Sequence, residues 1–217
     1  MRHAQVAYFE RDGRPARPEL VPLTAEGRQQ ARAAGAALAG VRFDRVVTSG
    51  LPWTLETAAL VAPTVQPESW PDFRELEAGR LAEIPEDELE EAFAGVFRDV
   101  VPPETRFLGG ETIASLLERV GGAIDSLLAD RAWDIVLAVL HGGVNRAILS
   151  RALAGEGVFL GNLEQSPACI NMLDVGPDSW IVRGVNITSH DPVHLGPRTR
   201  TMEELLEQYR PHRRRSP

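Results

Sequence analysis

Residues 133–149 of the chain read WDIVLAVLHGGVNRAIL. The residues before His141 form a nearly continuous apolar run, which is typical of a strand buried on both faces of a parallel sheet. Gly142 and Gly143 follow at once and open a segment with helical spacing, whose free backbone N–H groups would favour an anion. A buried strand that leads through a tight turn into a helix predicts an α/β fold, with a ligand site at the carboxyl end of that strand.

The same alternation of strands and helices runs through the rest of the chain. Thr24 is a good N-cap for one helix, and Pro52 stands in the first turn of another. Periodicity and end signals predict helices over residues 23–40, 51–62, 110–130, 142–155 and 201–210, and strands over residues 45–48, 133–141, 168–176 and 179–186. The chain is therefore expected to form a three-layer α/β/α sandwich with a mostly parallel central sheet.

The domain organisation is expected to be simple. Residues 1–205 are predicted to form a single domain, because a chain of 217 residues fits one large domain and no low-complexity linker interrupts it. Residues 80–110 are acidic and loosely periodic, which indicates a helical excursion from the core. The basic run RPHRRRSP ends the chain, and residues 206–217 are expected to be a disordered tail.

The composition limits function and location. A net charge of −8 argues against a nucleic-acid binder, and no apolar run reaches the roughly 18 residues of a membrane span. All 23 basic residues are Arg, which excludes a Lys nucleophile. Cys169 is the only cysteine and cannot form an internal disulfide, and no signal-peptide pattern opens the chain. We therefore expect a cytoplasmic protein.

Polar residues stand at the ends of three expected strands. Ser49 closes one strand and His141 closes another, while Arg2 and His3 would close a third. Because ligands bind outside the carboxyl ends of parallel strands, these side chains are expected to meet. Two His and an Arg beside a helix N-terminus suit a phosphate ester. Each feature alone is weak, since a His at a strand end is often a structural residue.

The order of these motifs along the chain resembles that of the histidine phosphatase superfamily, also called the phosphoglycerate mutase-like family. The resemblance runs from residue 2 to about residue 190 and is carried by RHAQ (2–5), PLTAEGRQQA (22–31), TSGLPWTLETA (48–58), FRELEAG (73–79), GGET (109–112) and VLHGGV (139–144). It implies a phosphoglycerate mutase-like fold and phosphoryl transfer that requires no metal and no other cofactor.

The resemblance also implies roles for single residues. His3 would attack phosphorus as a neutral imidazole and become a phosphohistidine, with nearby Arg charge disfavouring its protonated form. Arg2 would grip the phosphoryl oxygens with its planar fork, and Gln5 belongs to the same phosphate-binding opening. His141 would donate to the same oxygens, beside the backbone of Gly142.

Other polar residues leave alternatives open. Glu75 would protonate the leaving alcohol and then activate water, and Glu77 in the same acidic loop is the alternative. His190 and His194 could form a metal pair, but Pro192 lies between them and no Cys/His cluster accompanies them, so we predict no metal site. Three arginines of the polar loop after the opening could reach an anionic substrate or simply be solvated: Arg11, Arg14 and Arg17.

Two departures from the family pattern are expected to matter. The family places a second phosphate-binding Arg four residues after Ser49, where this chain has Trp53. Trp has one indole N–H and no charged fork, and the loss of one such donor costs roughly 100- to 1000-fold in rate. The family's first strand should run directly into Arg2, yet Met1 stands at its last position. We expect either about five more apolar residues upstream or a rearranged sheet.

These observations favour a phosphomonoesterase that acts through a phosphohistidine on a small phosphorylated metabolite. A phosphoglycerate mutase-type transfer is one alternative. The other is a pseudoenzyme, whose pocket binds a phosphorylated ligand without turnover because Trp53 replaces the Arg. Apart from the substrate we expect no nucleic-acid or membrane partner, and the chain could assemble as a homodimer.

Overall fold

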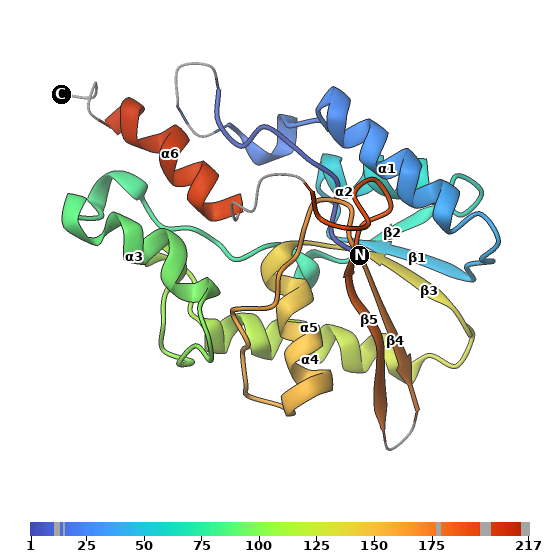
Figure 1. Cartoon of the computed structure of the whole chain (residues 1–217). Helices are drawn as coiled ribbons and strands as arrows, with labels where there is room; N and C mark the ends of the chain where they lie inside the picture. The colour runs from blue at the N-terminus through green and yellow to red at the C-terminus, as the bar shows by residue number, and fades with distance from the viewer. Residues whose placement is uncertain (11–13, 15, 177–178, 196–200, 214–217) are drawn as a thin grey trace.

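The computed structural model describes residues 1–10, 14, 16–176, 179–195 and 201–213, and it shows the predicted α/β fold (Figure 1). Its central sheet has three parallel strands in the order β2-β1-β3. They are β1 (Arg45–Thr48), β2 (Pro67–Ser69) and β3 (Val136–Val139). Sequence periodicity predicts β1 and β3, whereas β2 has only three residues and carries no alternating pattern.

Helices cover both faces of this sheet. α1 (Ala25–Ala37) and α2 (Pro52–Val61) pack on one face, and α4 (Ile113–Ala129) and α5 (Gly142–Ala154) pack on the other. Successive residues of β1 point into two separate apolar cores, one beside each pair of helices. The predicted three-layer α/β/α arrangement is therefore confirmed.

The helices that frame the sheet begin at the expected signals. The Thr24 hydroxyl accepts a hydrogen bond from the Gly27 N–H (2.9 Å) and caps α1. Thr112 caps α4 in the same way, accepting from the Ser115 N–H at 3.2 Å. Pro52 occupies the first turn of α2, where its missing N–H costs no helical hydrogen bond.

The first residues of the chain join the sheet to a second, antiparallel pair of strands. This pair is β4 (Ile170–Val175) and β5 (Trp180–Ile187). The N–H of His3 donates to the Leu140 carbonyl at 2.8 Å, just beyond β3, and the N–H of Arg2 donates to the Cys169 carbonyl at 3.1 Å, just before β4. These bonds hold Arg2 and His3 at the carboxyl edge of the parallel sheet.

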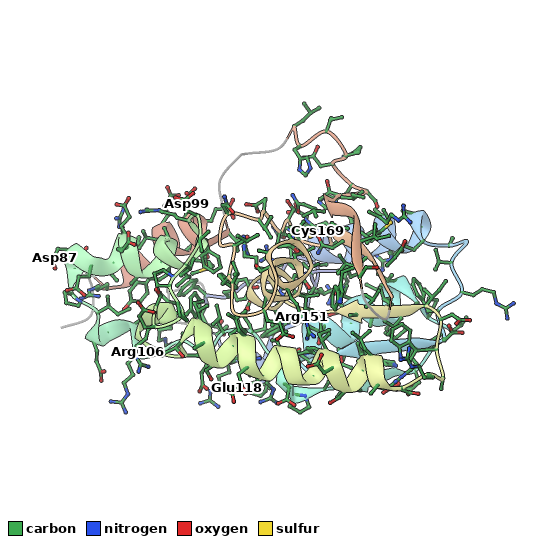
Figure 2. The ribbon with its side chains drawn as sticks, turned by 90° about the horizontal axis from the view of Figure 1, so that it is seen from below. Asp87, Asp99, Arg106, Glu118, Arg151 and Cys169 are labelled. Carbon is green, nitrogen blue, oxygen red and sulfur yellow. The ribbon has the colours of Figure 1, made fainter. Side chains whose placement is uncertain are left out.

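The excursion of residues 80–110 is helical, as predicted, but only one of its helices is an α-helix. This is α3 (Leu89–Ala94). The 3₁₀ turns of the chain, four of which belong to the excursion, are η1 (Pro18–Leu20), η2 (Pro71–Phe73), η3 (Leu81–Glu83), η4 (Glu86–Glu88), η5 (Gly95–Phe97) and η6 (Phe107–Gly109). Figure 2 shows how far the excursion extends from the sheet: Asp87 lies at its outer end and Cys169 near the strands.

The prediction of a disordered tail is wrong for residues 206–213, because α6 runs from Thr201 to Arg213 and packs against α3 (Figure 1). Leu206 and Tyr209 are buried in this contact, and an apolar face of this kind orders a helix that its basic residues alone would not. Residues 214–217 lie outside the described residues. In the described part of the chain, none of the helices combines the length and apolar character that crossing a membrane requires.

Candidate active site

Arg2, His3 and His141 meet at the carboxyl edge of the sheet, as the sequence predicts. The His3 and His141 rings lie 5.2 Å apart between centroids, and each residue is only 1% exposed. The Nε2 atom of His141 lies 2.8 Å from the hydroxyl of Ser49, which closes β1. The strand-end residues therefore form one cluster.

The His3 ring has a defined tautomer. Its Nδ1 lies 2.7 Å from the Ala4 carbonyl oxygen, which can only accept, so we assign the ring proton to Nδ1. Nε2 then carries the lone pair and accepts from the Tyr8 hydroxyl, 3.1 Å away. Burial raises the pKa of Tyr8, so this hydroxyl keeps its proton.

Both rings are neutral at pH 7. Burial lowers the pKa of His3 well below its ordinary value, and the nearby His141 and Arg2 lower it further. Burial likewise lowers the pKa of His141 from its ordinary 6.5 to about 4. The neutral nucleophile expected from the sequence is thus explained mainly by burial, and Arg2 is the smaller cause.

Glu75, rather than Glu77, faces the histidine cluster. The Gly143 N–H at the start of α5 donates to both Glu75 carboxylate oxygens at 3.0 Å. Arg119 fixes the Glu75 backbone by donating to its carbonyl at 3.3 Å, while its Nε binds Glu111 at 2.7 Å. Glu77 is exposed at the edge of the pocket. A half-buried carboxyl at a helix N-terminus is well placed to exchange a proton with a bound phosphate ester.

Trp53 lies where the sequence predicts a phosphate-binding position. Its ring is buried, with centroids 5.8 Å from the His3 ring, 6.1 Å from His141 and 6.3 Å from Tyr8. Within the described residues its indole N–H has no hydrogen-bond partner. Trp53 therefore offers one free donor and a flat surface against both histidines, but no charge.

Gln5 is not brought to this cluster. Its side-chain oxygen accepts from the Thr24 hydroxyl at 2.7 Å, and its backbone N–H donates to Gln30 at 3.0 Å. The chain turns after Ala4 toward α1, so the Gln5 side chain is used to anchor that helix. The predicted phosphate-binding role of Gln5 is therefore not supported by its contacts, whereas Gly142 does border the pocket.

A pocket of about 910 Å³ opens next to the cluster. Its polar floor consists of Arg2, Tyr8, Trp53, Glu75, Gly142 and Arg146. Its apolar wall comes from the excursion and α6 and consists of Leu81, Phe93, Phe97, Phe107, Leu108, Met202 and Leu205. His3 and His141 lie behind the floor, so a ligand reaches His3 Nε2 only after the Tyr8 hydroxyl moves aside.

Other predicted candidates lie apart from the pocket. His190 and His194 are exposed, and no group of three or more His, Cys, Asp or Glu side chains among the described residues could hold a metal ion. Arg17 is an exposed residue beside a separate hollow in the loop before α1, and Arg14 lines that hollow too. Arg11 lies outside the described residues.

Comparison with known proteins identifies the family. The model of the histidine phosphatase superfamily (branch 1) matches residues 1–188. The chain belongs to the histidine phosphatase superfamily. It is 26% identical to the uncharacterized phosphatase PhoE of Bacillus subtilis, over 78% of this chain and 84% of that one. It is 30% identical to the probable phosphoglycerate mutase GpmB of Salmonella typhi, over 85% and 87% of the two chains.

A solved structure supports the same fold. The alpha-ribazole phosphatase of Shigella flexneri aligns with a TM-score of 0.68 and 22% identity, over 86% of this chain and 94% of that one. The predicted histidine phosphatase fold is confirmed. As a member of this superfamily, the chain is a histidine phosphatase-type enzyme, either a phosphohydrolase or a phosphomutase.

The sequence reasoning missed several residues that shape this histidine phosphatase site. Arg2 donates through Nη1 to the Gln165 carbonyl (2.5 Å) and to the Thr201 hydroxyl (2.9 Å), contacts between distant segments that no local pattern predicts. Tyr8 and Arg119 were missed for the same reason. Arg146 could have been found, because it lies four residues after Gly142 on one predicted helix, and such residues share a face.

Proposed function

We propose that this chain is a phosphomonoesterase that transfers the phosphoryl group of its substrate first to His3 and then to water. The state of the His3 ring carries the proposal. With Nδ1 donating to the Ala4 carbonyl, the lone pair on Nε2 can attack phosphorus once the Tyr8 hydroxyl moves aside, and the same carbonyl stabilises the positive charge that the ring gains.

In the first step, Nε2 of His3 forms a bond to phosphorus while the bond to the ester oxygen breaks. Arg2 neutralises charge on the phosphoryl oxygens, and its Nε is free to do so, having no hydrogen-bond partner among the described residues. A protonated Glu75 gives its proton to the leaving alcohol. In the second step the Glu75 carboxylate takes a proton from water, and the water oxygen displaces His3 from phosphorus.

The apolar wall of the pocket favours a phosphatase over a mutase. Its outer side is the apolar wall, which suits a substrate whose alcohol portion carries apolar surface. A mutase must instead hold a phosphorylated sugar acid while the phosphoryl group returns to it. That alternative is supported by the 30% identity to a probable phosphoglycerate mutase, so it stays the second candidate.

The test is an assay of the full chain with 4-nitrophenyl phosphate and a panel of phosphorylated metabolites, analysed for free phosphate and for isomerised product. Free phosphate is expected, and His3→Ala is expected to abolish it. His190→Ala serves as the control, because His190 is exposed and does not border the pocket. Isomerised product without free phosphate would favour the mutase, and full turnover by His3→Ala would contradict both.

A catalytically silent site would give a different pattern. If Trp53 disables the enzyme, the full chain would bind inorganic phosphate without turnover, and Trp53→Arg would restore activity by supplying a charged fork. Absence of turnover in both proteins, with phosphate still bound, would replace the proposed phosphatase by a binding module.

A further inference from the structure

The charges on the polar floor do not balance a phosphate monoester. Such an ester carries close to two negative charges above its second pKa near 6. Arg2 supplies one positive charge, Glu75 adds none while it carries the proton for the leaving alcohol, and burial keeps His3 and His141 neutral. Because an uncompensated charge in a buried site is costly, another cation is needed close to the phosphoryl group.

Arg146 is a buried cation at the same floor. It is only 7% exposed, its Nε donates to the Gly161 carbonyl at 3.0 Å, and its guanidinium lies 4.7 Å from the centre of the Phe97 ring. No carboxylate in the described part of the chain forms an ion pair with it. Burial lowers the pKa of Arg146 to about 10, so it is still protonated at pH 7.

The surroundings of Gly142 show which space the Arg146 guanidinium borders. A methyl group placed on Gly142 would lie 3.1 Å from Nη1 of Arg146, 3.6 Å from Oε2 of Glu75 and 4.0 Å from Nε of Arg2. The same Nε of Arg2 is buried and has no hydrogen-bond partner within the described ranges. Two guanidinium groups and the carboxyl that exchanges the proton therefore surround one small space at the N-terminus of α5.

We propose that Arg146 is a phosphate-binding residue, which supplies the second cationic contact to the phosphoryl group of the substrate. This inference rests on the proposed function, since it places the phosphoryl group between Arg2 and Arg146. The contact comes from α5, whereas the uncharged Trp53 belongs to α2. It explains how a site without an arginine at position 53 can still offset the charge of a phosphate dianion.

The experiment compares the full chain with Arg146→Gln, which removes the charge and keeps an amide that can still donate to the Gly161 carbonyl. The dissociation constant for inorganic phosphate is measured by calorimetry, and the melting temperature reports on the fold. Loss of a charge-assisted contact is expected to weaken phosphate binding roughly 10- to 100-fold. The matched control is Arg151→Gln on the same helix. Arg151, labelled in Figure 2, forms an ion pair with Asp125 (2.7 Å) and lies outside this pocket.

Unchanged phosphate affinity in a folded Arg146→Gln protein would overturn the inference and leave Arg146 as a packing residue for Phe97. If this variant fails to fold, Arg146→Lys gives the same test, since it keeps the charge and loses the planar fork. Several-fold weaker phosphate binding is then expected, and unchanged affinity contradicts the inference. Phosphate binding needs no turnover, so this result is independent of whether His3→Ala abolishes activity.

Discussion

The polar floor and the apolar wall of the pocket are built in different ways. The floor gathers residues near strand ends, in loops and on α2 and α5, and hydrogen bonds fix several of them, as Gly143 fixes Glu75. The wall comes from the excursion and α6, whose side chains contribute surface and few polar contacts. The difference indicates that the floor determines the chemistry, whereas the wall determines which alcohol portion fits.

The largest effect is expected at the floor. Glu75→Gln removes the group that we propose donates and accepts the proton, and kcat should fall by roughly 100- to 10,000-fold while inorganic phosphate still binds. Glu77→Gln is the matched control, since Glu77 is exposed two residues further along the same loop. Steady-state assays with an alkyl phosphate measure both. A larger loss of kcat for Glu77→Gln than for Glu75→Gln would show that Glu77, and not Glu75, transfers the proton.

A smaller effect follows from the protonation of His141, which lies behind the floor. Because the pKa of His141 is about 4 in the folded protein and near 6.5 when unfolded, the unfolded chain binds more protons between these values. The contribution of His141 to the free energy of unfolding is therefore fully present above about pH 6.5 and declines as the pH falls toward 4. Between pH 7 and pH 4.5 this decline is on the order of 2 kcal/mol.

Urea unfolding at the two pH values checks this expectation. His141→Gln should lose less stability on acidification than the unmodified chain, by about the same 2 kcal/mol. The exposed His194 provides the control variant His194→Gln, which should keep the full pH dependence. An equal loss in the unmodified chain and in His141→Gln would show that His141 is not a buried neutral group.

The smallest effect is expected at the wall. Met202 is half-buried there, and Met202→Ser should raise KM for 1-naphthyl phosphate roughly 5-fold, since it removes about 1 kcal/mol of apolar contact. Affinity for inorganic phosphate should not change, because phosphate does not reach the wall. Met172→Ser, at an exposed position of β4, is the control. Weaker phosphate binding by Met202→Ser would remove the proposed division between floor and wall.

The floor and the histidine cluster behind it were largely predictable from the sequence, and the wall was not. Continuous apolar runs located β1 and β3, and the residues that follow these strands, Ser49 and His141, must lie at one edge of a parallel sheet. The wall depends on 3₁₀ turns without a repeating pattern and on α6, whose apolar residues are few. Tyr8 was missed because its contact with His3 follows from a loop conformation and not from residue spacing.

Phosphoryl transfer to His3 is tested most directly by trapping the intermediate. Glu75→Gln should accumulate it with 4-nitrophenyl phosphate, because the good leaving group needs no proton while the attacking water still needs a base. After rapid quenching at alkaline pH, mass spectrometry should find one phosphoryl group on the peptide that contains His3, and none on that peptide in His3→Ala. Turnover without any phosphorylated protein, or with the phosphoryl group on another residue, would contradict transfer through His3.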